Sequence, residues 1–214
     1  MVLNEIAEIT LRSLTISFSA MILASLWSIP LALYLSRDSS KAVNIVVGLF
    51  NSLVGVPTVV VGLFFYMLFS RSGPLGFIDI LYSPIAIAIG EAFLITPWIV
   101  SLGYELFRSA RQSYWELAIS LGIDEDAARI IMIKEVWPDL LVVLLMAFSR
   151  AVGELGVALL IGGNIKGATR VLTTTIALAV SRGEFEFALT LGGMLILILF
   201  LISLMIRMLK VYKE

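Results

Sequence analysis

Long apolar runs separated by short polar connections account for most of the chain. An α-helix needs roughly 20 apolar residues to cross a bilayer. Five runs reach this length: Leu14–Leu35, Val43–Ser70, Pro84–Phe107, Asp139–Ile161 and Phe187–Leu209. The pattern predicts an all-α membrane protein with about five transmembrane helices, folded as a single domain over residues 1–214.

The second run is long for one span and holds Pro57 in its middle. A proline has no N–H to donate to the helix ladder, and its ring clashes with the preceding turn. An over-long apolar segment can also tilt in the bilayer. We therefore expect Val43–Ser70 to tilt, to kink or to begin with an interfacial turn.

The distribution of Lys and Arg over the connections predicts the orientation, because cytoplasmic loops of membrane proteins are enriched in these residues. The richer side holds Arg37, Lys41, Arg108, Arg111, Arg129, Lys134, Arg207, Lys210 and Lys213. The poorer side holds Arg12, Arg71, Lys166, Arg170 and Arg182. The N-terminus is accordingly expected outside, and the C-terminus and the connection Arg108–Pro138 are expected in the cytoplasm.

Composition supports a membrane protein and excludes several kinds of chemistry. Hydrophobic residues make up 60% of the chain and charged residues 14%, far from the balance of a soluble domain. The net charge of −1 gives no basic field for nucleic acid. The sequence has no Cys and no His, so we expect no catalytic residues and no metal site. It also lacks a P-loop motif, so any ATP would have to be bound by a partner.

The polar connection Trp115–Pro138 is unusually long and charged. Its first part, Ser113–Leu121, has the apolar spacing of one short helix. Gly122 suits the left-handed position just past a helix end, and Asp124 suits the N-cap of a second helix. The segment is therefore expected to form two short helices that meet at an angle.

Charges in the second of these helices follow the helix dipole. Glu125 lies in its first turn, and Arg129 lies four residues later, which is the favourable order for an ion pair. Pro138 suits the first turn of the next span, so we expect that span to begin there.

The order Glu116-x-Ala118-x-x-x-Gly122 resembles the coupling loop by which permeases of binding-protein-dependent ABC importers grip their ATPase, with Leu117 in place of the usual middle Ala. Other stretches resemble oxyanion permeases of the molybdate, tungstate and sulfate group. They are Val56–Gly62, Arg71–Gly76, Gly153–Gly156, Gly162–Gly167 and Thr169–Thr174, the last three being most similar to tungstate-uptake permeases. A helical cytoplasmic loop without a partner is the alternative for the coupling segment.

The resemblance implies the MetI-like ABC permease arrangement in the inner cell membrane, and import of an oxyanion, most simply tungstate, with molybdate or sulfate as alternatives. It implies these partners: a second copy of the chain, two copies of an ABC ATPase, an extracytoplasmic oxyanion-binding protein and membrane lipid. The chain itself would bind no cofactor, since ATP and Mg belong to the ATPase. The residues implied in ATPase coupling are Glu116, Ala118, Gly122, Asp124 and Glu125.

Three ionisable residues, Glu91, Arg150 and Glu154, lie within predicted spans. A charge in the bilayer is costly and should face protein or water. Arg150 and Glu154 are spaced to pair on one helix. They are expected to border a translocation path together with Pro57 and Thr58, although a pair that only packs the bundle is the alternative. Glu91 is expected to be structural, hydrogen-bonded to Ser, Thr or a backbone group freed by Pro97, with a role in the pore as the alternative.

The outer connection Gly162–Glu186 combines glycines, hydroxyls and positive charge. Consecutive N–H groups in a Gly-rich turn can bind an anion. Contact with substrate or with a binding protein is predicted for Asn164, Lys166, Thr169 and Arg170. Within this connection, Val171–Val180 is apolar and is expected to form a short re-entrant or interfacial helix. A solvated loop is the alternative.

Two other functions compete with an ABC permease. An ion-gradient-driven secondary anion transporter would use Glu91 and Glu154 as titrating groups, but it leaves the coupling-like segment unexplained. A membrane-embedded enzyme is disfavoured, because the sequence offers no His, no Cys and no clustered carboxylates.

Overall fold

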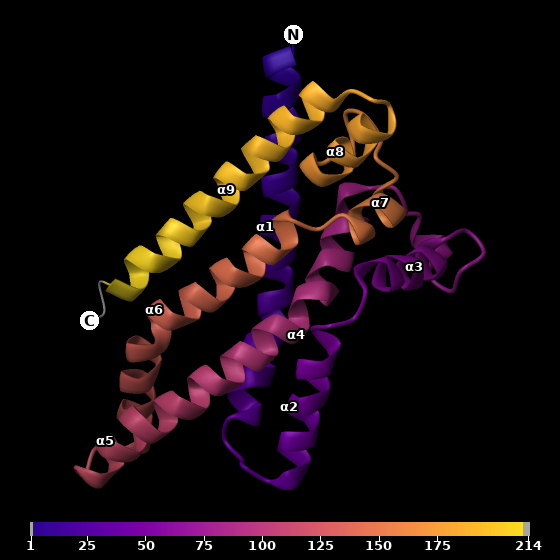
Figure 1. The fold of residues 1–214 in the computed structure, drawn as a ribbon. Coiled ribbons are helices and arrows are strands. Elements are labelled where there is room, and N and C mark those ends of the chain that lie inside the picture. Colours follow the sequence, from indigo (N-terminus) through magenta and orange to yellow (C-terminus); the bar gives the residue numbers. More distant parts are fainter. Residues whose placement is uncertain (1, 212–214) are drawn as a thin grey trace.

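The computed structural model describes residues 2–211, and within that range the chain is helical with no β-strand (Figure 1). The long helices are α1 (Val2–Leu35), α4 (Pro84–Ala110), α6 (Glu125–Val152) and α9 (Phe185–Val211). The shorter helices are α2 (Lys41–Leu53), α3 (Thr58–Phe69), α5 (Glu116–Ser120), α7 (Gly156–Gly162) and α8 (Leu172–Ser181). A 3₁₀ turn, η1 (Gly76–Ile78), and a π-helical turn, η2 (Arg111–Trp115), complete the set.

Each predicted apolar run is helical, but two of the five runs are bent. Among the described residues, α1, α4 with its continuation, and α9 are each long and apolar enough to cross a membrane. The pairs α2–α3 and α6–α7 reach the required length only together, with bends of 96° and 58°. The number of candidate spans is therefore three, or up to five when each bent pair counts as one span.

Pro57 lies at the first of these bends. Helix α2 ends at Leu53, and Pro57 occupies the N-cap position of α3 with an extended backbone, ψ 126°. Because proline has no N–H and restricts the residue before it, the α2 helix cannot continue through Val56 and Pro57. Of the three alternatives for this run, the structure has the kink.

Pro138 is the site of a correction. It lies inside α6, which runs without a break from Glu125 to Val152, so the expectation that Pro138 stands in the first turn of a helix is wrong. A buried stripe on α6 passes the proline on both sides; its members, four residues apart, are Ala128, Met132, Val136 and Leu140. Packing of this stripe holds the helix together where one backbone hydrogen bond is missing. The second helix of the charged segment is thus the start of a long helix, not a short one.

The main core lies where α1, α4, α6 and α7 meet, and the largest interface is that between α1 and α4. Small side chains line this core, and the buried alanines include Ala20, Ala24, Ala86, Ala92, Ala147, Ala151 and Ala158. Small residues let helices approach closely, which replaces the missing hydrophobic driving force inside a bilayer. Helix α9, by contrast, is poorly covered by the rest of the chain.

The two polar regions singled out in the sequence lie at opposite ends of the molecule (Figure 1). The N-terminal end of α1, α8 and the connection after α7 occupy one end, and α5 occupies the other. Helix α9 descends from the α8 end toward the end that carries α5. The fold therefore separates a charged helical corner from a Gly- and Thr-rich loop by the full length of the helices.

Candidate functional site

The charged corner is built by local backbone chemistry. Helix α4 continues through η2 into α5, and the chain then turns at Gly122, whose φ is +81°. The N–H of Ile123 donates to the carbonyl of Ala118 at 3.1 Å, and that of Gly122 to Ile119 at 2.9 Å. This pair of bonds is the Schellman ending, which needs a residue in the left-handed region and so favours glycine. The prediction for Gly122 is confirmed.

Asp124 starts the helix on the far side of the corner. Its Oδ1 accepts a hydrogen bond from the N–H of Ala127 at 3.0 Å, as the N-cap prediction requires. Glu125 and Arg129 form the predicted ion pair at 3.1 Å. The positive φ of Gly122 and the side-chain cap of Asp124 together set the direction in which the chain turns from α5 into α6.

The corner presents a mixed apolar and acidic surface. Ala118 is 5% exposed, whereas Leu117 and Leu121, one helical turn apart, are 56% and 73% exposed. Glu116, Asp124 and Glu125 are also exposed. Of the five residues predicted for coupling, four have exposed side chains or an exposed backbone, and Ala118 lies inward where a larger side chain would separate α5 from its neighbours. The exposed leucine pair was not predicted, although its i,i+4 spacing in a charged segment was a usable signal.

The predicted pair of Arg150 and Glu154 is present. Arg150 Nη1 donates to Glu154 Oε2 at 2.8 Å. The two residues are not on one helix, however, because α6 ends at Val152 and Glu154 lies in the break before α7. The other carboxylate oxygen, Oε1, accepts from the N–H of Val157 at 3.2 Å, and the carbonyl of Glu154 accepts from the Thr173 hydroxyl at 2.7 Å. Glu154 thus anchors the start of α7, with a side chain 2% exposed, while the Arg150 side chain is 31% exposed.

The bends of the two broken spans meet. A Cβ placed on Gly156, the first residue of α7, would lie 2.7 Å from Thr58 Oγ1 and 2.9 Å from Val59 N. A Cβ on Gly62 would likewise lie 3.0 Å from the carbonyl oxygen of Gly156. Glycine at both positions is what lets α3 and α7 touch backbone to backbone. The structure thereby brings Thr58, which follows Pro57, against the start of α7, two residues after Glu154.

Glu91 is buried on α4, and its carboxyl oxygen Oε2 has no hydrogen-bond partner among the described residues. Ser17 of α1 is the polar neighbour of its carboxyl group. Thr96, the residue before Pro97, is engaged elsewhere: it donates to Ala92 O at 2.8 Å and accepts from Trp27 Nε1 at 2.9 Å. The expected neighbour is therefore a serine of another helix and not the threonine beside Pro97.

The hydroxyls of the outer connection are used inside the protein. Thr169 is fully buried, and its Oγ1 donates to the carbonyl of Gly162 and accepts from Ile165 N. Thr174 and Thr175 both bond the carbonyl of Val171, at 3.1 and 2.6 Å. These bonds shape the loop and the start of α8, the helix that the apolar stretch Val171–Val180 predicted. Thr169 therefore has no free hydroxyl at the surface.

The charged residues of the same connection do reach the surface. Lys166 Nζ pairs with Glu5 Oε1 of α1 at 2.7 Å. Arg170 Nη2 contacts Asn164 O at 3.5 Å, and Arg12 Nη1 donates to Arg170 O at 3.1 Å. Lys166 and Arg170 line a cavity of about 350 Å³ together with Arg182, Glu5 and Glu184, among others. This end of the molecule is therefore a polar cavity with three cations and two carboxylates in its wall.

Comparisons with known proteins place these features in a wider context. The family model described as "Binding-protein-dependent transport system inner membrane component" matches residues 14–212. A tungstate uptake system permease protein of Peptoclostridium acidaminophilum is 34% identical over 206 residues, which cover 96% of this chain and 90% of that one. A tungstate uptake system permease protein of Campylobacter jejuni is 35% identical over 160 residues, 75% of this chain and 67% of that one. Sulfate and molybdenum transport permeases also match.

A solved structure matches almost the whole chain. The crystal structure of an amino acid ABC transporter with histidines aligns with a TM-score of 0.64, covering 99% of this chain and 94% of that chain. The identity between the two is 18%, so the likeness is one of fold. The overall fold of this chain is therefore shared with a chain of a solved transporter.

Proposed function

This chain belongs to the family of binding-protein-dependent transport system inner membrane components, and from that premise we propose that it imports tungstate as one of two identical membrane subunits of an ABC transporter. The observation that carries the substrate is the 34% identity with a tungstate uptake permease over 96% of the chain. Molybdate and sulfate are the competing ions, because permeases named for them are relatives as well.

The corner around α5 is the contact for the ATPase in this proposal. It projects from one end of the molecule, carries the exposed pair Leu117 and Leu121, and is held at fixed angle by Gly122 and the Asp124 cap. A rigid corner transmits a displacement without absorbing it. ATP and Mg would be bound by the ATPase, and the acidic side chains of Glu116 and Glu125 would contact that partner and take no part in the chemistry.

The translocation path in this proposal runs past the two bends. The partly exposed guanidinium of Arg150 offers positive charge to an oxyanion. Glu154 limits how tightly the ion is bound, because its carboxylate already accepts a hydrogen bond from one of the guanidinium N–H groups. Pro57 and Thr58 lie beside this pair through the contact of Thr58 with Gly156. A second copy of the chain would close the path from the other side, and the exposed apolar side chains of α9 and α3 would face that copy or lipid.

The opposite end receives the binding protein. We assign it to the outside, with the N-terminus, and assign α5 and the C-terminus to the cytoplasm, following the Lys and Arg distribution. Lys166 and Arg170 line the polar cavity there, and the carbonyl of Asn164 accepts a hydrogen bond from Arg170. These three are the contact residues, whereas Thr169 holds the loop in shape from within. Closure of the ATPase pair on ATP would move the two corners and switch the path from inward-open to outward-open.

Uptake measurements in cells that lack this chain test the proposal. Tungsten accumulation, measured by elemental mass spectrometry, should be restored by the wild-type chain and should stop when ATP is depleted while the ion gradient is maintained. Preferred accumulation of molybdenum or sulfur would overturn the substrate. Uptake that survives ATP depletion and stops with an ionophore would instead support the ion-gradient alternative, which family membership disfavours.

A further inference from the structure

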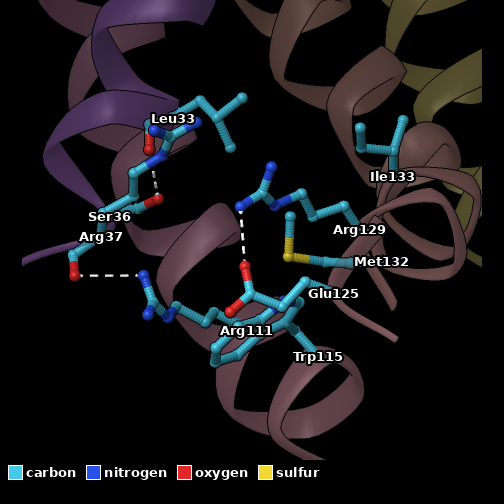
Figure 2. Close-up of a pocket in the computed structure, with 9 residues that line it drawn as sticks. All are labelled: Leu33, Ser36, Arg37, Arg111, Trp115, Glu125, Arg129, Met132 and Ile133. Atoms are coloured by element: carbon cyan, nitrogen blue, oxygen red, sulfur yellow. Dashed lines mark hydrogen bonds and ion pairs between the residues drawn. The ribbon is translucent and has the colours of Figure 1, made fainter. Parts of the chain in front are cut away.

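A cavity of about 400 Å³ lies between the end of α1, η2 and the first turns of α6. Its wall includes Arg37 after α1, Arg111 and Trp115 of η2, and Glu125 and Arg129 of α6 (Figure 2). The end of α1 is far in the sequence from η2 and α6, which are joined through the corner at α5.

Positive charge predominates in this wall. The Arg129 guanidinium pairs with Glu125 at 3.1 Å and with Asp126 at 3.6 Å. Arg111 stacks on the Trp115 ring, with Cζ 4.6 Å from the ring centroid, and donates to the carbonyl of Arg37 at 3.1 Å. Within the described part of the chain, no hydrogen bond or ion pair engages the Arg37 guanidinium. Three arginines thus face one lining carboxylate, and Arg37 keeps all five of its N–H donors.

The acidic neighbour of Arg37 in sequence does not neutralise it. Asp38 accepts a hydrogen bond from Ser40 N at 2.9 Å. Bonds from Ser40 hold the pKa of Asp38 below its ordinary value, so the carboxylate is charged but already engaged with its own turn. The cavity therefore retains a net positive charge beside the end of α1.

The remaining wall is mostly apolar, and the cavity lies where apolar helices end. Leu33, Met132 and Ile133 form it together with the Trp115 ring. Arg37 follows the apolar α1 by two residues, and Arg111 directly follows α4. Arg and Trp at the ends of apolar helices mark the membrane interface, and basic pockets between helices on the cytoplasmic side suit anionic phospholipid headgroups.

We propose that this cavity binds a phosphate group, and that the phosphate belongs to an anionic phospholipid of the cytoplasmic leaflet. The phosphate oxygens take the free donors of Arg37 and the outer donors of Arg111, and the lipid chain lies along Leu33 and Ile133. The ligand bridges the end of α1 to η2 and α6, so its occupancy ties the transmembrane body to the corner. The inference does not depend on which ion the protein transports.

Arg37→Gln is the sharpest variant, because the Arg37 side chain makes no contact that the fold needs, and the carbonyl that accepts from Arg111 is retained. Arg207→Gln is the matched control. Arg207 is exposed near the C-terminal end of α9, and its loss changes the net charge by the same amount. Arg111→Gln is a second test, although it also removes the stack on Trp115.

The experiment is native mass spectrometry and thermal unfolding of the purified full chain in neutral detergent with phosphatidylglycerol, with phosphatidylcholine or with inorganic phosphate. The wild type and Arg207→Gln should retain phosphatidylglycerol over phosphatidylcholine and be stabilised by it. Arg37→Gln should bind it about tenfold more weakly, the effect of losing charge-assisted hydrogen bonds.

Each arm has a decisive result. Equal weakening in Arg37→Gln and Arg207→Gln would overturn the site, as would a wild type that neither phosphatidylglycerol nor phosphate stabilises. Stabilisation by inorganic phosphate without retention of phosphatidylglycerol would keep the phosphate site but overturn the lipid as its source. None of these results depends on transport activity, so they are independent of the test of tungstate uptake.

Discussion

The guanidinium of Arg150 and the carboxylate of Glu154 are unequally buried, with side-chain exposures of 31% and 2%. Removing Arg150 alone leaves a buried carboxylate without its counter-ion, which costs about 3–5 kcal/mol. We expect Arg150→Met to lower both the thermal stability of the purified chain and tungstate uptake. Neutralising both partners, in Arg150→Met with Glu154→Gln, should restore most of the stability, because no uncompensated charge then remains.

Uptake by the double variant separates the two roles of the pair. If Arg150 attracts the oxyanion, the double variant is stable and still transports poorly. If the pair only packs the bundle, stability and uptake recover together. Glu154→Gln alone serves as the reference, since the amide oxygen can still accept from Val157 N and so keep the start of α7.

Gly122 carries the turn of the corner with φ +81°. An alanine there adopts the left-handed conformation at a cost of about 1–2 kcal/mol. Gly122→Ala should therefore loosen the corner and lower the amount of ATPase that co-purifies with the chain. Gly192→Ala on α9 is the control, because its Cβ would meet nothing within 4 Å and its backbone is helical. Equal ATPase recovery from both variants would contradict a rigid corner.

Contact between α3 and α7 depends on the absence of a side chain at Gly156. A Cβ there would meet backbone and hydroxyl atoms of α3 at 2.7–2.9 Å, so the helices would have to separate. Overpacking of this kind costs about 1–3 kcal/mol. We expect Gly156→Ala to lower the unfolding temperature and tungstate uptake.

Gly153→Ala is the matched control for that variant. Gly153 lies in the same break, but a Cβ on it would make ordinary contacts at 3.7 Å or more. Its backbone has φ −82°, which any residue adopts. Loss of stability in both variants alike would mean that the break, and not the α3–α7 contact, is the sensitive feature.

The tip of α5 offers a test that spares the fold. Leu121 is 73% exposed, so Leu121→Asp should leave the unfolding temperature unchanged while it weakens co-purification of the ATPase. An exposed leucine at the other end of the molecule, Leu3, gives the control variant Leu3→Asp. ATPase recovery that is normal with Leu121→Asp, or lost with both variants, would remove the tip from the interface.

The elements differ in how far sequence could predict them. The lengths of the apolar runs predicted where helices occur. The corner could be predicted as well, because the left-handed turn at Gly122 and the cap of Asp124 depend only on residues close by in the sequence. The sequence did not show that Pro57 would stand at a helix break and Pro138 inside a continuous helix. Pro57 lies where one helix has ended and the next begins, whereas α6 continues through Pro138 with a buried stripe packed on both sides of it. That difference lies in tertiary packing and leaves no mark in the local pattern.

The sites show the same limit. The pairs of Glu125 with Arg129 and of Arg150 with Glu154 were predictable because both are four residues apart. The bond from Arg111 to Arg37 joins residues 74 apart, and the inward position of Thr169 follows from a carbonyl of Gly162 that needs a donor. From the sequence alone, the hydroxyl of a loop residue such as Thr169 is expected at the surface, and only the folded structure shows that its hydrogen-bond partner is buried.

Transmembrane orientation is a property of the whole molecule, and the chain offers a clean background for measuring it because it has no native cysteine. Ser120 at the end of α5 and Ser181 at the end of α8 are both exposed, and each hydroxyl bonds the carbonyl three residues earlier at 2.7 Å. Ser120→Cys and Ser181→Cys are therefore equally conservative. In intact cells, a membrane-impermeant thiol reagent should label Ser181→Cys, and it should label Ser120→Cys only after permeabilisation.

The same two variants also test the five-span arrangement. An odd number of crossings puts α5 and the C-terminus on one side and α8 and the N-terminus on the other, as the two ends of the molecule lie in Figure 1. If α6–α7 turned back without crossing, α5 and α8 would lie on the same side of the membrane. Labelling of both cysteines from outside, or of neither, would then be observed. Opposite labelling with Ser120→Cys outside would mean either that the protein is inverted or that α2–α3 turns back without crossing. In both cases η2 and α5 would lie away from the anionic cytoplasmic leaflet.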